Sequence, residues 1–75
     1  MIKKGIYRHY KGGEYEVLGE AVHSETLQKM VIYKALYKSP DFPVGTWWVR
    51  PADMFSEWIE IGGKSLPRFE WIRES

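Results

Sequence analysis

Residues 6–22 read IYRHYKGGEYEVLGEAV, and this stretch decides the fold class. Its first part, Ile6 to Tyr10, is rich in aromatic residues, whereas its second part, Glu14 to Val22, alternates between apolar and acidic positions. A period of two with acids on one side is typical of a half-buried β-strand. Between the two parts, Lys11-Gly12-Gly13 predicts a tight hairpin turn, because glycine adopts a positive φ without strain.

The next run, Lys29 to Tyr37, is rich in valine, isoleucine and tyrosine. Apolar residues fall on both of its alternating faces, which predicts the most central strand of the sheet. A helix is the competing interpretation, because Met30, Lys34 and Leu36 tolerate helices. The β-branched and aromatic content favours the strand.

The rest of the chain continues as short extended runs separated by turn residues. Proline and glycine make 39–45 a loop, since neither residue continues a strand ladder. Pro51 to Phe55 predicts one helical turn that begins at the proline. Gly62-Gly63 predicts a second glycine turn. The further strands are expected at Thr46–Arg50, Ser56–Ile61 and Lys64–Ile72.

These runs predict an all-β fold in a single SH3-like domain that spans residues 1–75. About five or six strands in this length fit a small SH3-like barrel or a strongly bent antiparallel sheet, with one short helical turn near Pro51–Phe55. An OB-fold usually needs a longer chain and a helix between strands. The residues expected to hold the core together are Val17, Val31, Tyr33, Val49, Phe55, Ile59 and Phe69.

The composition limits the class of partner and the compartment. Hydrophobic residues make up 44% of the chain and aromatic residues 16%, which argues against disorder. The formal net charge is only +1, so nucleic acid is not a favoured partner. The lack of cysteine excludes disulfides and Cys-based zinc sites and fits a reducing cytosol. No apolar run is long enough for a signal peptide or a membrane span, so we expect a cytoplasmic protein without membrane contact.

A series of short motifs carries a resemblance to a known family. In order, the motifs are Gly5–Gly12 (GIYRHYKG), Tyr15–Gly19 (YEVLG), His23–Thr26 (HSET), Val31–Tyr33 (VIY), Leu36-Tyr37, Trp48–Pro51 (WVRP), Met54-Phe55 and Pro67–Phe69 (PRF). In order and spacing the chain resembles the bacterial family catalogued as domain of unknown function 1653, from Gly5 to Phe69. The resemblance implies a small standalone protein that is β-rich and SH3-like, and it supplies no established activity, substrate or cofactor.

Four tryptophans and five tyrosines exceed what so small a core can hide completely. Exposed rings on a small barrel form a groove that docks peptides or stacks bases. An arginine among aromatic residues can stack on a ring and grip a carboxylate or phosphate. We therefore predict a non-catalytic binding module with an aromatic-basic groove for a peptide, a partner protein or single-stranded nucleic acid. The predicted groove residues are Tyr7, His9, Tyr33, Trp48, Arg50 and Arg68.

Other interpretations stay open at this point. The rings can simply line the core, and Arg50 can form an internal ion pair with Asp53 or a nearby glutamate. A small hydrolase or nucleotide-handling enzyme is the alternative function, and its centre is His23, Ser24, Glu25 and Arg50. A structural domain that dimerises through Trp47 and Trp48 is a further alternative, so the chain is expected to be a monomer or a homodimer.

The two histidines show no HxH, HxxxH or HExxH spacing, so we predict no metal site and no cofactor. Sequence neighbours in a strand point in different directions, so the adjacency of His23, Ser24 and Glu25 does not indicate a catalytic relay. The simpler interpretation is that His23 ends a strand and hydrogen-bonds the turn that follows.

Overall fold

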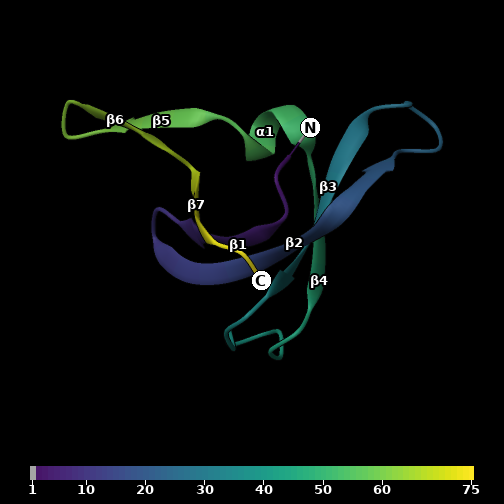
Figure 1. The fold of residues 1–75 in the computed structure, drawn as a ribbon, viewed down its shortest axis with the longest axis horizontal. Helices are drawn as coiled ribbons and strands as arrows, with labels where there is room; N and C mark the ends of the chain where they lie inside the picture. Colours follow the sequence, from purple (N-terminus) through teal and green to yellow (C-terminus); the bar gives the residue numbers. More distant parts are fainter. Residues whose placement is uncertain (1) are drawn as a thin grey trace.

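The computed structural model describes residues 2–75 as antiparallel strands with one short helix, which confirms the all-β prediction. The elements are β1 (Gly5–His9), β2 (Gly12–Val22), β3 (Lys29–Ala35), β4 (Trp47–Pro51), α1 (Ala52–Phe55), β5 (Trp58–Ile61), β6 (Lys64–Pro67) and β7 (Phe69–Arg73). Five strands form one sheet in the order β4-β3-β2-β1-β7, and β5 pairs with β6 in a separate sheet (Figure 1). Within residues 2–75 the large sheet bends but does not close, since its edges β4 and β7 do not pair. The bent antiparallel sheet is therefore the predicted alternative that the structure bears out, and the closed barrel is not.

The hairpin of β1 and β2 contains the predicted glycine turn in a modified form. Its tip is Tyr10-Lys11, and Gly12 begins β2 opposite His9. The pairing then jumps to Arg8 opposite Glu14, which leaves Gly13 as an unpaired bulge residue. Gly12 has a φ of +98°, a conformation that strains residues with a side chain. The local sequence thus fixes both the hairpin and the place where its backbone kinks.

The extended structure predicted for Lys29–Tyr37 is confirmed, but its predicted central position is wrong. The strand ends at Ala35 and lies between β2 and β4, so the central strand is the eleven-residue β2. The reason lies in the second apolar face of β3. Met30 and Ile32 are half-buried there and line an open hollow beside exposed Val49, instead of packing into the core.

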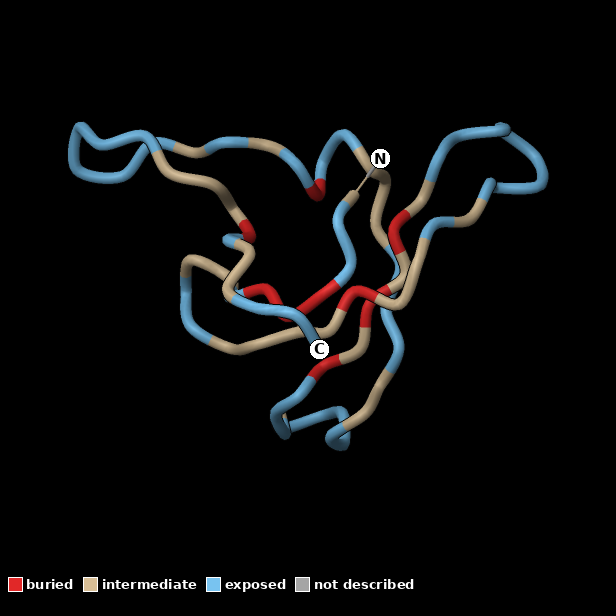
Figure 2. Tube along the Cα trace, viewed as in Figure 1, coloured by how far each residue is buried: buried red, intermediate tan, exposed pale blue. Residues whose placement is uncertain are grey.

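The core lies where β1, β2 and β3 meet α1 and β7, as the buried segments in Figure 2 show. Its buried members are Tyr7, Val17, Val31, Tyr33, Phe55 and Phe69. Five of these were among the seven predicted core residues, and Ile59 is half-buried in β5. Val49, however, is 59% exposed, because its pairing with Ile32 puts it on the outer face of the sheet. The prediction for Val49 is therefore wrong.

The predicted helical turn is present as α1, directly after Pro51, whose φ of −53° suits a helix start. It delivers Phe55 to the core, where this side chain is only 2% exposed. No helix in residues 2–75 is long and apolar enough to cross a bilayer.

The predicted last strand, Lys64–Ile72, is split into β6 and β7 at Arg68. The backbone N–H of Arg68 donates to Glu57 at 3.0 Å, while its C=O accepts from the N–H of Tyr10 at 3.0 Å. These two bonds tie the β5–β6 hairpin to the large sheet. The split sends β7 to pair with β1, and this places Phe69 beside His9.

Candidate functional site

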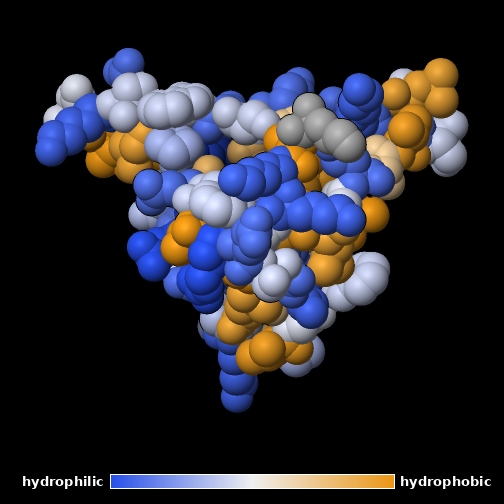
Figure 3. Space-filling view, in the orientation of Figure 1, coloured by the Kyte–Doolittle hydropathy of each residue, from blue (hydrophilic) through white to orange (hydrophobic). Residues whose placement is uncertain are grey.

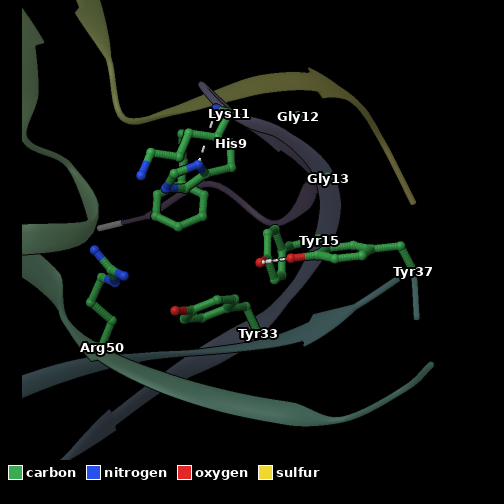
Figure 4. Close-up of a pocket in the computed structure, with 9 residues that line it drawn as sticks. His9, Lys11, Gly12, Gly13, Tyr15, Tyr33, Tyr37 and Arg50 are labelled. Carbon is green, nitrogen blue, oxygen red and sulfur yellow. Dashed lines mark hydrogen bonds between the residues drawn. The ribbon is translucent and has the colours of Figure 1, made fainter. Parts of the chain in front are cut away.

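A pocket of about 420 Å³ opens between the β1–β2 turn and the β3–β4 side of the large sheet (Figure 4). Small-molecule sites usually occupy about 300–1,000 Å³, so the volume suits a small ligand or one side chain of a larger partner. Aromatic and basic residues dominate the lining, and none of the lining residues is acidic. We call this hollow the aromatic–basic pocket; its lining residues are His9, Lys11, Gly12, Gly13, Tyr15, Tyr33, Tyr37, Arg50 and Phe69.

Strand pairing brings the polar groups of the pocket together. In β3 and β4, Val31 pairs with Arg50 and Tyr33 with Trp48, and directly opposed residues share a face of the sheet. Arg50 and Tyr33 are therefore diagonal neighbours on the same face. In the close-up the hydroxyl of Tyr33 points toward the Arg50 guanidinium (Figure 4).

The floor of the pocket is a cluster of rings around Phe69. Phe69 stacks on Phe55 from the core, with centroids 4.3 Å apart and planes within 7°. Tyr15 and Tyr33 meet Phe69 edge-on at 5.7 and 5.6 Å, and His9 does so at 4.8 Å. Edge-to-face and stacked pairs each add about 0.5–1.5 kcal/mol beyond area burial. The floor is therefore fixed before any ligand arrives.

A pair of tyrosine hydroxyls forms one wall. The hydroxyls of Tyr15 and Tyr37 are hydrogen-bonded to one another, and their rings meet edge-on at 5.4 Å. Burial, and next the hydrogen bond to Tyr37, raises the pKa of Tyr15 above its ordinary value. Tyr15 therefore stays a neutral phenol at physiological pH, and it adds no negative charge to the pocket.

Arg50 has no carboxylate partner in the part of the chain that the structure describes. The other three arginines, Arg8, Arg68 and Arg73, each form an ion pair with a glutamate. The internal pair between Arg50 and Asp53 that the sequence left open is not formed, and the Asp53 carboxylate instead accepts the N–H of Met54 at 2.8 Å. The Arg50 guanidinium lies 5.3 Å from the centre of the Phe69 ring. Its N–H donors remain available to a ligand.

Tyr33 provides a second donor without a protein partner. The residue is only 5% exposed, yet its hydroxyl forms no hydrogen bond with another side chain or backbone group within residues 2–75. No side-chain nitrogen or oxygen within residues 2–75 is both fully buried and unpaired, so the Tyr33 hydroxyl keeps some contact with solvent. The pocket is the space into which this hydroxyl opens, so a ligand atom or a water molecule can take the missing place.

His9 adds a neutral, donating nitrogen. Its Nδ1 accepts the backbone N–H of Lys11 at 3.2 Å, which leaves the proton of the neutral ring on Nε2. Burial lowers the pKa of His9 below its ordinary value, and the positive charges of Arg50, Arg68 and Lys11 lower it further. These charges surround one imidazole, so the pocket has a positive potential even though the whole chain is nearly neutral.

The lowered pKa of His9 predicts a specific pH dependence. A group whose pKa is lower in the folded state than in the unfolded state contributes stability above the unfolded value, about 6.5, and that stability is lost as pH falls through the folded pKa. We expect the imidazole resonances of His9 to titrate below pH 6.5 in an NMR experiment. Thermal stability should also fall less between pH 7.5 and pH 5 in His9→Gln than in the natural protein. A His9 midpoint above 6.5 would contradict the arrangement.

Three of the six predicted groove residues, His9, Tyr33 and Arg50, line the pocket. The other three do not. Tyr7 lies in the core and donates its hydroxyl proton to the C=O of Lys3 at 2.6 Å. Trp48 shares a sheet face with Arg50, but its ring packs on Phe42 of the 39–46 loop, with centroids 4.7 Å apart. Arg68 is held by Glu57, with 2.8 Å between the guanidinium and the carboxylate.

Sequence reasoning missed three side chains that complete the pocket, Lys11, Tyr15 and Tyr37. The alternation of residues 14–22 put Tyr15 on the same strand face as Val17, and Tyr15 was assigned neither to the core nor to the groove. Lys11 looked like part of a solvated turn. The signal that was available is the glycine pair, since a bulge at Gly13 turns the hairpin tip over the sheet.

The residues of the alternative enzyme hypothesis do not converge. His23, Ser24 and Glu25 are exposed in the connection between β2 and β3, and none of them lines the pocket that contains Arg50. The Nδ1 of His23 accepts the backbone N–H groups of Glu25 and Thr26 at 3.2 and 3.3 Å, as expected for a residue that ends a strand. Within residues 2–75 no three acidic or histidine side chains are grouped as a metal site.

Apolar side chains are exposed elsewhere on the molecule. Trp47 is 66% exposed and Val49 is 59% exposed, on the face of β4 opposite to Arg50. Figure 3 shows further hydrophobic side chains over the projecting β2–β3 hairpin and near the β3–β4 loop, and hydrophilic side chains over the centre of this face. The outer apolar face and the aromatic–basic pocket therefore lie on different sides of β4.

Comparison with known proteins identifies relatives of the whole chain. The sequence matches the family described as "Protein of unknown function (DUF1653)" over residues 5–71. A crystal structure of a protein of this family from Bordetella bronchiseptica is similar, with 32% sequence identity and a TM-score of 0.86. The alignment covers 99% of this chain and 91% of that one. No curated protein matches the sequence.

Proposed function

We propose that this chain, which belongs to the DUF1653 family of proteins of unknown function, is a recognition module that binds an anionic group in its aromatic–basic pocket. The observation that carries the proposal is the pairing state of Arg50. It is the one arginine in residues 2–75 without a carboxylate partner, and it lies in a pocket without acidic residues. The SH3-like character and the cytoplasmic location expected from the sequence stay part of this proposal.

The chemistry of the lining selects the charge of the ligand. Arg50, Lys11, the Nε2–H of neutral His9 and the free hydroxyl of Tyr33 all can donate hydrogen bonds. A guanidinium binds the two oxygens of a carboxylate or a phosphate with two parallel hydrogen bonds, and such charge-assisted bonds are stronger than neutral ones. A cationic ligand would meet only positive charge here. The pocket therefore suits a carboxylate or a phosphate.

The size and charge of the domain favour a local anion rather than a long polyanion. Proteins that bind single-stranded nucleic acid without sequence preference usually present a positive groove along several nucleotides. Here the net charge is +1, and Arg8, Arg68 and Arg73 are already paired with glutamates. Of the three predicted partners, a peptide or a partner protein that presents an acidic group fits the pocket better than single-stranded nucleic acid, and a small anion fits it equally well.

The test is a titration of isotope-labelled protein with inorganic phosphate and with acetate, followed by NMR. We expect amide shifts at Gly12 and Gly13 and in the Arg50 region, and a rise in the His9 pKa when anion is added. Arg50→Gln should weaken binding about tenfold or more, because a hydrogen bond to a charged group contributes about 1.5–3 kcal/mol. Arg73→Gln is the matched control, since it changes net charge equally outside the pocket. If both variants lose the same amount of affinity, the effect is due to net charge alone, and the pocket is not the binding site.

The dimerising domain predicted from the sequence is a separate question. Neither Trp47 nor Trp48 lines the pocket, so a dimer through these two residues would leave the pocket open and does not compete with the proposed function. Light scattering of the natural protein and of Trp47→Ser decides it. A dimer that Trp47→Ser dissociates supports that assembly, and a monomer at all concentrations excludes it.

A further inference from the structure

Binding of an anion alone does not explain why Tyr37 is held in place at the pocket. It follows the end of β3 and is 39% exposed, although most rings of the pocket are buried deeper. An exposed tyrosine on a loop normally moves between rotamers. Here two contacts hold it. Its hydroxyl is bonded to Tyr15, and its ring edge lies against the backbone of Gly13, where an added Cβ would come within 2.7 Å of the ring.

The lack of a side chain at Gly13 therefore helps to shape the pocket. Any side chain at position 13 would displace the Tyr37 ring, so the glycine bulge leaves room for it. The result is an aromatic ring that is both exposed and fixed in place. A fixed, exposed ring is a good binding surface because little conformational entropy is lost when a ligand stacks on it.

The pocket has two chemically different ends. Figure 4 shows Arg50, Tyr33, Tyr15 and Tyr37 following one another across the pocket, with Arg50 and Tyr37 at opposite ends. Tyr33 and Tyr15 are in edge-to-face contact at 5.2 Å, and Tyr15 and Tyr37 at 5.4 Å. The Arg50 end offers charge and hydrogen-bond donors. The Tyr37 end offers ring surface without charge.

From this polarity we propose that the ligand is an anion joined to a planar ring, with the anionic group at Arg50 and Tyr33 and the ring stacked on Tyr37. The inference rests on the proposed function and extends it by naming the ligand class. Base–aromatic stacking tolerates many ring types, because every planar ring has a π-face. No asparagine, glutamine or acidic side chain lines the pocket to read the edge of a ring, so selectivity should be for planarity and charge.

The experiment compares matched ligands with and without a ring. Phenyl phosphate is compared with methyl phosphate, and phenylacetate with acetate, by NMR titration or calorimetry. The two pairs distinguish a phosphate ligand from a carboxylate ligand, since the pair with the higher affinity identifies the head group. We expect each ring-bearing anion to bind about tenfold more tightly than its ringless partner, which is within the range reported for stacking on one aromatic side chain.

Variants separate the ring from the charge. Tyr37→Leu should remove the tenfold advantage, so that each ring-bearing anion binds this variant about as tightly as its ringless partner does. Tyr37→Phe keeps the ring and should retain most of the advantage. Arg50→Gln should weaken all four ligands. Thermal melts of each variant confirm that the fold is intact.

The outcomes are distinguishable. If Arg50→Gln weakens the ringless anions but the ring adds nothing to affinity, the proposed function stands and this inference is wrong. If Tyr37→Leu weakens ringless and ring-bearing anions equally, Tyr37 only shapes the pocket, and stacking is rejected. If Arg50→Gln changes no affinity, the proposed function itself fails.

Discussion

Replacing Phe55 with alanine is expected to remove about 3–5 kcal/mol of the free energy of unfolding. Phe55 is 2% exposed, stacks on Phe69 and meets the rings of Tyr7 and Tyr33 edge-on. Truncating Phe55 leaves a cavity among these rings that the surrounding structure refills only partly. Domains have stabilities of about 0.05–0.15 kcal/mol per residue, so the loss is a large part of the total.

The measurement is thermal or urea unfolding followed by circular dichroism. A domain of this size loses about 4–8 °C in melting temperature per kcal/mol, so Phe55→Ala should melt at least about 12 °C lower. Trp58→Ala is the matched control, because this ring is 65% exposed and its loss should change stability by no more than about 0.5 kcal/mol. Equal shifts in the two variants would mean that the aromatic cluster is not the core.

Replacing Gly5 with alanine is the second change with a large expected effect. Gly5 has a φ of +137°, where residues with a side chain are strained. A Cβ there would lie 2.5 Å from Nε1 of Trp71 and 2.6 Å from the backbone oxygen of Arg73. The Trp71 side chain can move only by losing its hydrogen bond to the C=O of Lys4, and the backbone oxygen belongs to β7. Strain and overpacking together should cost about 3 kcal/mol.

Gly19→Ala is the control for this prediction. Gly19 lies in β2, its φ is not positive, and a Cβ there would meet no atom within 4 Å. We expect Gly19→Ala to melt at or slightly above the natural protein, whereas Gly5→Ala should melt about 10 °C or more below it. If both alanines are tolerated, β1 and β7 are not packed as closely as described.

The sequence predicted the strands and turns well because those features depend on near neighbours. Alternation in residues 14–22 marked β2, and Pro51 marked the start of α1. Its failures all involve partners distant in sequence. Val49 was placed in the core because apolar residues alternate with others on any strand, and only its pairing with Ile32 shows which face is outside. The split at Arg68 depends on the contact with Glu57, which local patterns do not contain.

The candidate pocket shows the same limit. Arg50 was identified because its aromatic neighbours are adjacent in sequence, but whether it was paired internally depended on which arginines the fold places beside glutamates. Trp48 and Arg50 do share a face, yet Trp48 turns to Phe42 in a loop whose conformation the sequence did not predict. Residue type and alternation therefore identified the candidate residues, and long-range packing determines which of these candidates line the pocket.

The pairing of β1 with β7 has a consequence for how the protein is made. Ribosomes produce β1 early and β7 late, and contacts such as that between Lys4 and Trp71 span 67 residues. A nascent chain that has not yet reached Phe69 has neither a complete hydrophobic cluster nor a pocket floor. Folds dominated by such distant pairings form more slowly than helical ones of equal size. Productive folding should therefore wait until nearly the whole domain has left the exit tunnel, and until then its unpaired strands are exposed to aggregation.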